Sequence, residues 1–344
     1  MTFPWPIHPD MRELLAAKET FAKLSDAGAQ RAGWNNYANA LQREYPAGMT
    51  VLDTEFPCDV ADGPRNIPVR IYRPEAVTAQ SPCVVYLHGG AFIKGSLESG
   101  DPISWGIADH VGCVVVSVDY RLAPEHPFPA GVEDCYAAIS YIAAHGRELE
   151  IDARNIAVWG DSAGGNMAAA CCLMARDRKG PPIAAQVLIY PCLTDELTAA
   201  SYRTYADAPV TTASIDRAWS LYLGDRRPTR DPYAAPLKAT DFSHLPPAHI
   251  HEAQIDCLAD DSVQYAERLR AAGNPLVFRR AQDMIHGFVR ARFTGPGARS
   301  EFDAPCGFLR GIFANRTREP RRTDETADRG GEVDVSRSPS RAGP

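Results

Sequence analysis

The strongest chemical signal in the sequence is the segment Gly160–Gly164, which reads Gly-Asp-Ser-Ala-Gly. It follows an apolar run typical of a buried strand and precedes a run typical of a helix, and G-x-S-x-G in that setting is a nucleophile elbow. The tight turn lifts the hydroxyl of Ser162 above the sheet edge, where the N–H groups that begin the helix favour developing negative charge. Ser162 is therefore the candidate nucleophile for acyl transfer.

A second segment, His88-Gly89-Gly90-Ala91, also stands at the end of a predicted buried strand. Acyl transfer passes through a tetrahedral oxyanion that needs backbone N–H donors, and glycines let the backbone come close to it. We assign the N–H groups of Gly89, Gly90 and Ala163 to this oxyanion hole. His88 is interpreted as a residue that orients the loop by hydrogen bonding, not as the catalytic base.

A serine nucleophile needs a base, and the base needs a group that orients it. After Ser162, a predicted strand ends at Asp256, and a later one runs into His286. Both residues are expected on the loop edge where Ser162 lies. In this interpretation His286 takes the Ser162 proton and returns it to the leaving alcohol, while Asp256 fixes the histidine tautomer and stabilises the imidazolium.

Other acids and histidines compete for these roles. Asp260 and Asp261 fall inside or at the start of the next predicted helix, where helix capping suits them better. His244, His249 and His251 are alternatives for the base. Because His249 and His251 stand two residues apart on one face of a strand, they could form a metal pair, but no third ligand is evident and no metal is expected.

The elements that position these residues follow the rhythm of an α/β domain. Unbroken β-branched runs predict strands buried on both faces, as in a parallel sheet. Strands alternate with helices, which predicts a doubly wound α/β sheet. The expected strands cover residues 49–56, 67–72, 83–87, 113–118, 156–159, 185–190, 248–255 and 275–281. The expected helices cover residues 99–110, 131–145, 163–176, 261–272 and 300–313.

Two segments outside this rhythm are expected to form a helical lid. One begins at Asp10, which with Glu13 resembles a capping box, and contains two short amphipathic helices. The other contains an amphipathic helix over residues 215–223. The expected division is an N-terminal cap segment (1–48), a first core part (49–194), a cap insertion (195–240), a second core part (241–315) and a disordered tail (316–344).

Composition excludes several classes of protein. The chain has 344 residues, of which 45% are hydrophobic and 23% charged, which is ordinary for a soluble globular protein and excludes a disordered, collagen-like or coiled-coil chain. A formal net charge of -7 gives no electrostatic reason to bind nucleic acid or a membrane surface. Nine cysteines without a CxxC pair indicate reduced thiols. With neither a signal peptide nor a membrane span in the pattern, a cytoplasmic location is expected.

Taken together, the motifs resemble the bacterial hormone-sensitive-lipase-like esterases, an α/β-hydrolase family. The resemblance covers about residues 1–313. It implies an α/β-hydrolase fold: a mostly parallel eight-stranded sheet flanked by helices, with a helical cap. It also implies a Ser162–Asp256–His286 triad and hydrolysis of short- to medium-chain carboxylic esters without a cofactor. The matching segments are His88-Gly-Gly, residues 119–130, residues 160–166, Asp256 with Asp260, and Ile285-His-Gly-Phe288.

The chain departs from the family pattern at two positions near the site. The family commonly has a third glycine where this chain has Ala91, and alanine keeps the N–H donor provided that its φ is not positive. Cys257 replaces a frequent proline, which frees an N–H and leaves the Asp256 carboxylate unchanged. Arg121, Glu125 and Asp134 are expected to brace the loops under the site.

Two other functions fit part of this pattern. An amidase or formamidase would use the same triad, with His286 protonating the leaving nitrogen, and the residues alone do not separate it from an esterase. A non-catalytic ligand receptor is a further alternative, because some plant hormone receptors share the fold but lack the catalytic histidine. His286 is present here, which argues against a receptor.

Acyl-chain preference is expected to lie in the lid. The aromatic candidates for the substrate pocket are Trp34, Tyr37, Phe92 and Trp219, with plain core packing as the alternative for each. A small pocket under two helical segments would favour acetyl to octanoyl esters over long-chain lipids. The expected partner is a small-molecule ester, and a homodimer is an open alternative.

Overall fold

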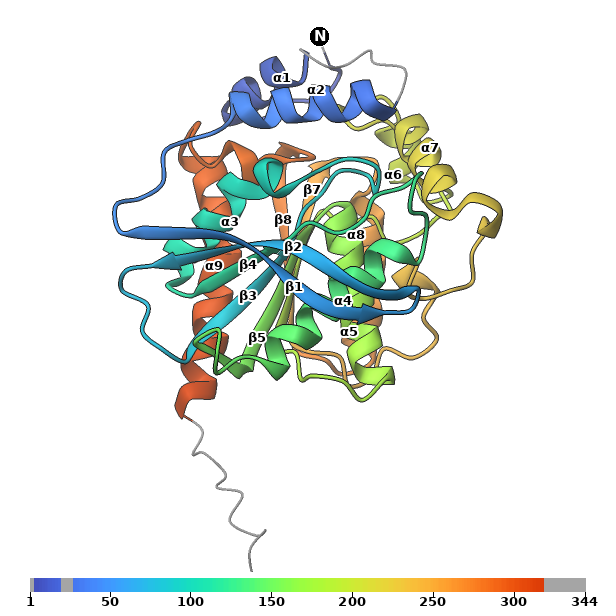
Figure 1. Cartoon of the computed structure of the whole chain (residues 1–344). Helices are drawn as coiled ribbons and strands as arrows, with labels where there is room; N and C mark the ends of the chain where they lie inside the picture. The colour runs from blue at the N-terminus through green and yellow to red at the C-terminus, as the bar shows by residue number, and fades with distance from the viewer. Residues whose placement is uncertain (1–2, 20–26, 319–344) are drawn as a thin grey trace, which may run out of the picture.

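An eight-stranded sheet forms the centre of the molecule (Figure 1). The computed structural model describes residues 3–19 and 27–318. The strand order is β1-β2-β4-β3-β5-β6-β7-β8. Strand β2 is antiparallel to both of its neighbours, and the remaining six strands, β3 to β8, are parallel to one another. The expected mostly parallel eight-stranded sheet is confirmed. The strands are β1 (Met49–Val60), β2 (Gly63–Pro74), β3 (Ser81–Leu87), β4 (Val114–Val118), β5 (Ile151–Asp161), β6 (Ala185–Ile189), β7 (Ala248–Ile255) and β8 (Leu276–Ile285).

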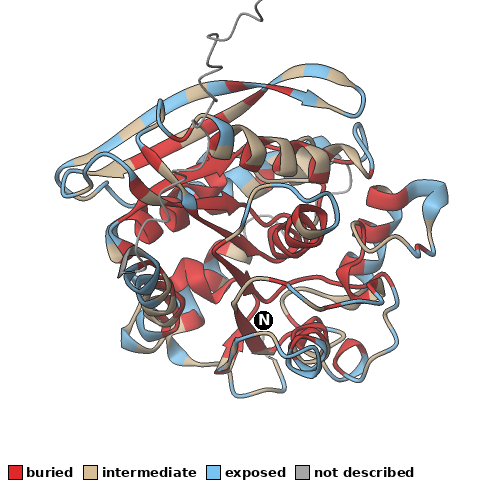
Figure 2. Cartoon of the chain, turned by 90° about the horizontal axis from the view of Figure 1, so that it is seen from below, coloured by how far each residue is buried: buried red, intermediate tan, exposed pale blue. Residues whose placement is uncertain are grey.

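The central strands are buried on both faces, which explains their unbroken apolar sequences. In β3, the side chains of Val85 and Leu87 belong to one hydrophobic cluster and those of Val84 and Tyr86 to the other, because successive residues of a strand point to opposite faces. Figure 2 shows the buried residues concentrated in the central strands and the helices against them, whereas the hairpin of β1 and β2 carries many exposed residues.

Helices cover both faces of this sheet. One cluster contains side chains of α3 and α9, and the other contains side chains of α4, α5 and α8, in agreement with the two helical layers of Figure 1. Both faces are thereby removed from water, which is what a sheet of parallel strands requires. The core helices are α3 (Leu97–Val111), α4 (Ala130–Ala144), α5 (Ala163–Asp177), α8 (Ala259–Ala271) and α9 (Pro296–Arg318).

A third group of helices lies at one end of the sheet, beyond the carboxyl ends of its parallel strands (Figure 1). It combines two segments far apart in the sequence, as expected for a lid. Its helices are α1 (Arg12–Glu19), α2 (Ala27–Ala40), α6 (Ser201–Thr204) and α7 (Thr212–Leu223). Short 3-10 turns occur at η1 (Pro9–Met11), η2 (Gly224–Arg226), η3 (Pro236–Lys238) and η4 (Phe288–Ala291).

The expected capping box at Asp10 is wrong. The Asp10 side chain accepts the N–H of Ala298, at 3.0 Å, in the first turn of α9. The side chain of His8 instead accepts the Asp10 N–H at the start of η1. Each helix start has several N–H groups without an intrahelical acceptor, so Asp10 could cap either helix, and the tertiary contact joins the N-terminal segment to α9.

Helix α9 begins earlier and ends later than expected, since it continues to Arg318. The start of the segment expected to be disordered is therefore helical, and residues 319–344 lie outside the described part of the chain. Within the described residues, no helix is both long and apolar enough to cross a bilayer. All nine cysteines are buried and unbridged.

Candidate active site

Ser162 occupies the sharp turn between β5 and α5, with φ 58° and ψ −119°. A positive φ is strained for a residue other than glycine and marks functional turns. The glycines on either side are required by space: a Cβ on Gly160 would lie 2.0 Å from the Gly164 carbonyl oxygen, and one on Gly164 would lie 1.9 Å from the Leu87 carbonyl oxygen. The local sequence therefore determines the elbow that was predicted.

The three residues of the expected triad lie in hydrogen-bond contact. The Nε2 atom of His286 is 2.9 Å from the Ser162 Oγ, and its Nδ1 is 2.6 Å from Oδ2 of Asp256. The other Asp256 oxygen accepts the N–H of Leu258 at 3.1 Å. Asp256 is fully buried, while Ser162 and His286 keep 6% and 8% exposure. This is the geometry of a nucleophile, a base and an orienting acid.

The sheet explains why these three residues meet. Ser162 follows β5, Asp256 follows β7 and His286 follows β8. All three strands are parallel members of one sheet, so their carboxyl ends lie on the same edge. The Tyr190 ring, after β6, packs 4.4 Å from the His286 ring and supports its orientation.

One of the three N–H donors expected for the oxyanion hole, that of Gly89, already has an acceptor. The N–H of Gly89 donates to Oδ1 of Asp161 at 3.0 Å and is therefore occupied. Gly90 and Ala91 line the cavity above Ser162, and their N–H groups have no acceptor among the described residues. Ala163 begins α5, so its N–H has no intrahelical acceptor either. The geometry therefore favours Gly90, Ala91 and Ala163 as donors, and Gly89 as a support.

Ala91 does not meet the condition set by the sequence, because its φ is 56°, but its backbone N–H is kept and has no acceptor among the described residues. The loop imposes this conformation: the Gly90 carbonyl accepts the N–H groups of Ile93 and Lys94, at 3.2 and 3.1 Å. Gly90 itself has φ +146°, and a Cβ there would lie 1.9 Å from the Lys94 carbonyl oxygen. Ala91 consequently stays in a left-handed conformation that glycine would adopt at lower cost.

Asp161 is a functional residue that the sequence reasoning missed. Its Oδ1 accepts the Tyr86 hydroxyl at 2.6 Å as well as the Gly89 N–H, and Arg290 lies 4.0 Å from Oδ2. A buried carboxylate with these partners joins the elbow to the glycine loop. Its place directly before Ser162 in the motif was the available signal.

His88 supports the same loop, as interpreted from the sequence. Its Nδ1 lies 3.1 Å from the Gly89 carbonyl oxygen, and its ring stacks on Tyr120 at 4.3 Å. The Tyr120 hydroxyl donates to the His88 carbonyl at 2.6 Å. Burial lowers the pKa of His88 to about 4, so its imidazole is neutral near pH 7 and does not act on the triad.

The expected braces form ion pairs. Arg121 binds the buried Asp134 in a forked contact, with Nε 2.9 Å from Oδ2 and Nη2 2.8 Å from Oδ1. Glu125 pairs with Arg31 of α2 at 2.6 Å, and the same guanidinium donates to the Ile93 carbonyl at 2.8 Å. The cap is thereby attached to the segment that follows the glycine loop.

The expected capping role of Asp260 and Asp261 is wrong, although neither belongs to the triad. The start of α8 has no side-chain cap. Asp261 accepts the Leu193 N–H at 2.7 Å and the Tyr202 hydroxyl at 2.9 Å, and Asp260 accepts the Ser201 N–H at 2.9 Å. Burial raises the pKa of Asp261 to about 7. Both carboxylates hold the segment where the core leads into the cap insertion.

His249 and His251 lie on β7, within the core and away from Ser162. The Nε2 of His251 is 2.8 Å from Glu301, which also binds Arg279 at 2.8 Å. Burial lowers the pKa of His249 to about 3, and neither of its nitrogens has a hydrogen-bond partner among the residues that the structure describes. Within residues 3–19 and 27–318, no group of three or more acids, histidines or cysteines is arranged to hold a metal ion.

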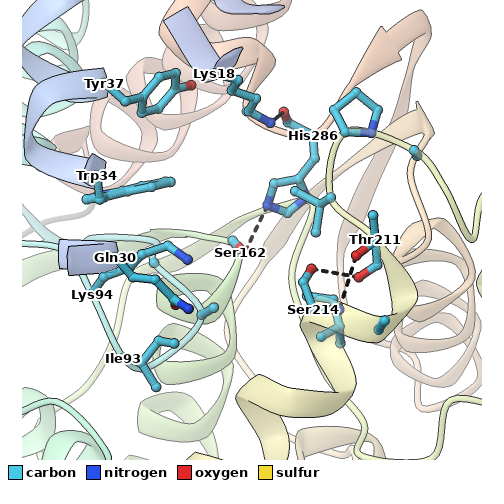
Figure 3. Close-up of a pocket in the computed structure, with 18 of the residues that line it drawn as sticks. Lys18, Gln30, Trp34, Tyr37, Ile93, Lys94, Ser162, Thr211, Ser214 and His286 are labelled. Carbon is cyan, nitrogen blue, oxygen red and sulfur yellow. Dashed lines mark hydrogen bonds between the residues drawn. The ribbon is translucent and has the colours of Figure 1, made fainter. Parts of the chain in front are cut away.

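A cavity of about 590 Å³ lies over Ser162 and His286. Figure 3 shows Trp34 and Tyr37 of α2 on one side of it and Thr211 and Ser214 on the other, so both cap segments form its walls. The sequence analysis also expected Phe92 and Trp219 to line this cavity, and that expectation is wrong. Instead, Phe92 stacks on Tyr222 at 4.1 Å, with the Trp219 ring 5.0 Å away, and both predicted residues are buried in the core.

Comparison with known proteins gives a consistent set of relatives. A family model described as alpha/beta hydrolase fold matches residues 84–290. Esterase LipI of Mycobacterium tuberculosis (strain ATCC 25618 / H37Rv) is 43% identical over 233 residues, which cover 66% of this chain and 73% of that protein. Carboxylesterase NlhH of the same strain is 41% identical over 241 residues, which cover 69% and 76%.

Solved esterase structures share the architecture. The thermostable esterase from Pseudomonas putida ECU1011 superposes with a TM-score of 0.84 and 27% identity, over 91% of this chain and 99% of that chain. The hyperthermophilic esterase from the archaeon Pyrobaculum calidifontis gives a TM-score of 0.81 and 35% identity, over 89% and 99%. The similarity therefore extends over most of the chain.

Proposed function

Since the chain belongs to the α/β-hydrolase family, we propose that it is a serine carboxylesterase that hydrolyses short- to medium-chain esters through an acyl-enzyme on Ser162. The observation that carries the proposal is the relay from Ser162 through His286 to Asp256, with contacts of 2.9 and 2.6 Å. Relatives that are named esterases support the same reaction.

The first half of the reaction forms the acyl-enzyme. Ser162 Oγ attacks the ester carbonyl carbon while Nε2 of His286 takes the hydroxyl proton. The carbonyl oxygen becomes an oxyanion that accepts hydrogen bonds from the N–H groups of Gly90, Ala91 and Ala163. These donors belong to the folded backbone, so they need no reorganisation during the reaction. His286 then gives the proton to the leaving alkoxide, which departs as the alcohol.

The second half restores the enzyme. Water attacks the acyl carbon while His286 takes one of its protons, and the same N–H groups stabilise the second oxyanion. His286 returns the proton to Ser162 Oγ as the carboxylic acid leaves. Asp256 holds Nδ1 of the imidazole throughout and stabilises the imidazolium that forms twice.

The size of the cavity supports small substrates. Its volume, about 590 Å³, is typical of small-molecule pockets. We further propose a cytoplasmic location, which the nine buried and unbridged cysteines support, because reducing compartments keep such thiols unpaired.

The test compares the wild type with Ser162→Ala on para-nitrophenyl esters from acetate to palmitate. We expect hydrolysis to be fastest on short and medium chains and to fall by on the order of 10³-fold or more in the variant. Labelling of the wild type by an organophosphonate, absent in the variant, locates the nucleophile. Hydrolysis that survives in pure, folded Ser162→Ala protein would contradict the proposal.

A further inference from the structure

Two lysines face the cavity over the triad, and neither was a candidate in the sequence. Lys18 belongs to α1, and Lys94 follows the glycine loop. Figure 3 shows both side chains directed toward the cavity, Lys18 beside His286 and Lys94 beside Gln30 and Trp34. Burial lowers the pKa of each to about 8, so both ammonium groups are still mostly charged at pH 7.

Lys18 has partners that compensate its charge. Its Nζ donates to the His286 carbonyl at 3.1 Å. The Asp256 carboxylate is close enough to raise the pKa of Lys18, against the larger effect of burial. Lys18 therefore belongs with the machinery that positions His286.

Lys94 lacks such compensation. Its Nζ lies 5.4 Å from the centroid of the Trp34 ring, and Arg290 lies 5.2 Å from the same centroid. No carboxylate of the described residues pairs with Lys94, and burial is the one cause of its lowered pKa. Three acids of the described residues line the cavity: Asp161 accepts the Gly89 N–H and the Tyr86 hydroxyl, and Glu19 and Asp207 are exposed.

Lys94 is half-buried, and a half-buried ammonium group is less stable without a counter-ion than with one. Taking an ammonium group partly out of water is unfavourable unless an anion meets it, and a ring contact offsets only part of this cost. A carboxylate on a ligand would supply the missing anion through a short, charge-assisted hydrogen bond. Apolar side chains also line the cavity, among them Val210 and Ile215, and these suit the hydrocarbon part of the same ligand.

Building on the proposed function, we propose that the preferred substrates are esters that carry a second, ionised carboxylate, and that Lys94 pairs with this group. The class comprises half-esters of dicarboxylic acids and acyl esters of hydroxy acids. Lys94 then determines specificity and takes no part in proton transfer, because Ser162, His286 and Asp256 already complete the relay.

The experiment uses two matched pairs of esters and the full-length chain. para-Acetoxybenzoate is compared with para-acetoxybenzamide, and mono-para-nitrophenyl adipate with para-nitrophenyl hexanoate, so the carboxylate is tested on both sides of the ester bond. In the wild type we expect kcat/KM to be about tenfold or more higher for the charged member of at least one pair, which corresponds to ~1.4 kcal/mol.

Two variants test whether Lys94 causes this preference. We expect Lys94→Met, which keeps the length of the side chain, to bring the ratio for the pair close to one, and Lys94→Glu to invert it. The matched control is Lys179→Met, because Lys179 is exposed beyond the far end of α5, about 22 Å of helix from Ser162. Its ratio should equal that of the wild type.

The outcomes separate the two proposals. A wild-type ratio of one or less in both pairs, or a ratio unchanged in folded Lys94→Met and Lys94→Glu, overturns the role of Lys94 while ester hydrolysis stands. Failure of folded wild type to hydrolyse any of the four esters, together with no organophosphonate labelling, overturns the proposed function itself.

Discussion

The backbone N–H of Gly89 donates to Oδ1 of Asp161 at 3.0 Å, across 72 residues of sequence. This contact attaches the glycine loop to the strand that ends at the nucleophile. It occupies the Gly89 N–H, whereas the next two residues, Gly90 and Ala91, line the cavity, and we propose their N–H groups as the oxyanion donors. The Asp161 carboxylate thus helps to hold the glycine loop beside Ser162.

Replacing Asp161 should therefore impair catalysis without removing a reacting group. Asp161→Ala loses the acceptor for Gly89 and for the Tyr86 hydroxyl, and we expect kcat to fall by about 10²-fold because small misplacements of donors are costly. Asp161→Asn keeps one acceptor oxygen and should lose less. Steady-state kinetics of both variants, with circular dichroism to verify folding, checks the order; an Asn variant worse than the Ala variant would refute the tether.

The triad acid is distinguished from its neighbour by paired substitutions. Asp256→Asn should lower kcat by on the order of 10⁴-fold, by analogy with the serine-protease triad, since the amide favours the wrong tautomer of His286. Asp260→Asn should cost far less, because the Asp260 side chain accepts the Ser201 N–H at the start of the cap insertion. If kinetics showed the reverse order, the acid would have to be reassigned.

The strained alanine of the loop offers a test of stability. Ala91 has φ 56°, so Ala91→Gly should raise the free energy of unfolding by up to about 1 kcal/mol, the relief of strain being partly offset by the entropy of glycine when unfolded. Ala91→Val should be destabilising, because a β-branched residue tolerates this φ poorly. Urea denaturation measures both, and a stabilising valine would show that the loop is not strained.

Because His249 is buried and its pKa is lowered, we expect the folded protein to lose stability in acid. The pKa of His249 is about 3 in the folded chain and about 6.5 in the unfolded chain. Below pH 6.5 the unfolded state therefore binds the proton and the folded state does not, so stability falls as the pH falls. Between pH 7 and pH 5 this histidine alone should remove about 2 kcal/mol from the free energy of unfolding.

The measurement compares urea denaturation of the wild type and His249→Phe at several pH values. The phenyl ring is close in shape and does not titrate, so the variant should lose less stability between pH 7 and pH 5. Burial also lowers the pKa of His88, to about 4. The variant should therefore keep part of the dependence of its unfolding free energy on pH. Equal slopes for both proteins would show that His249 does not control the acid sensitivity.

The sequence by itself determined the parts of the site that depend on local geometry. Gly160 and Gly164 permit one tight turn around Ser162, and the unbroken apolar strands predict a parallel sheet. A parallel sheet brings the residues that follow its strands to one edge, which is why Asp256 and His286 could be named in advance as partners of Ser162.

Only the tertiary structure decided which partner each remaining group takes. Asp10 caps α9 instead of its own helix, Gly89 donates to Asp161, Phe92 packs in the core while Trp34 lines the cavity, and Lys94 has no counter-ion in the described part of the chain. The physical reason is common to all four. A hydrogen-bond donor, an aromatic ring or a charge can be satisfied by many neighbours, and folding alone determines which residues from distant parts of the chain come within reach.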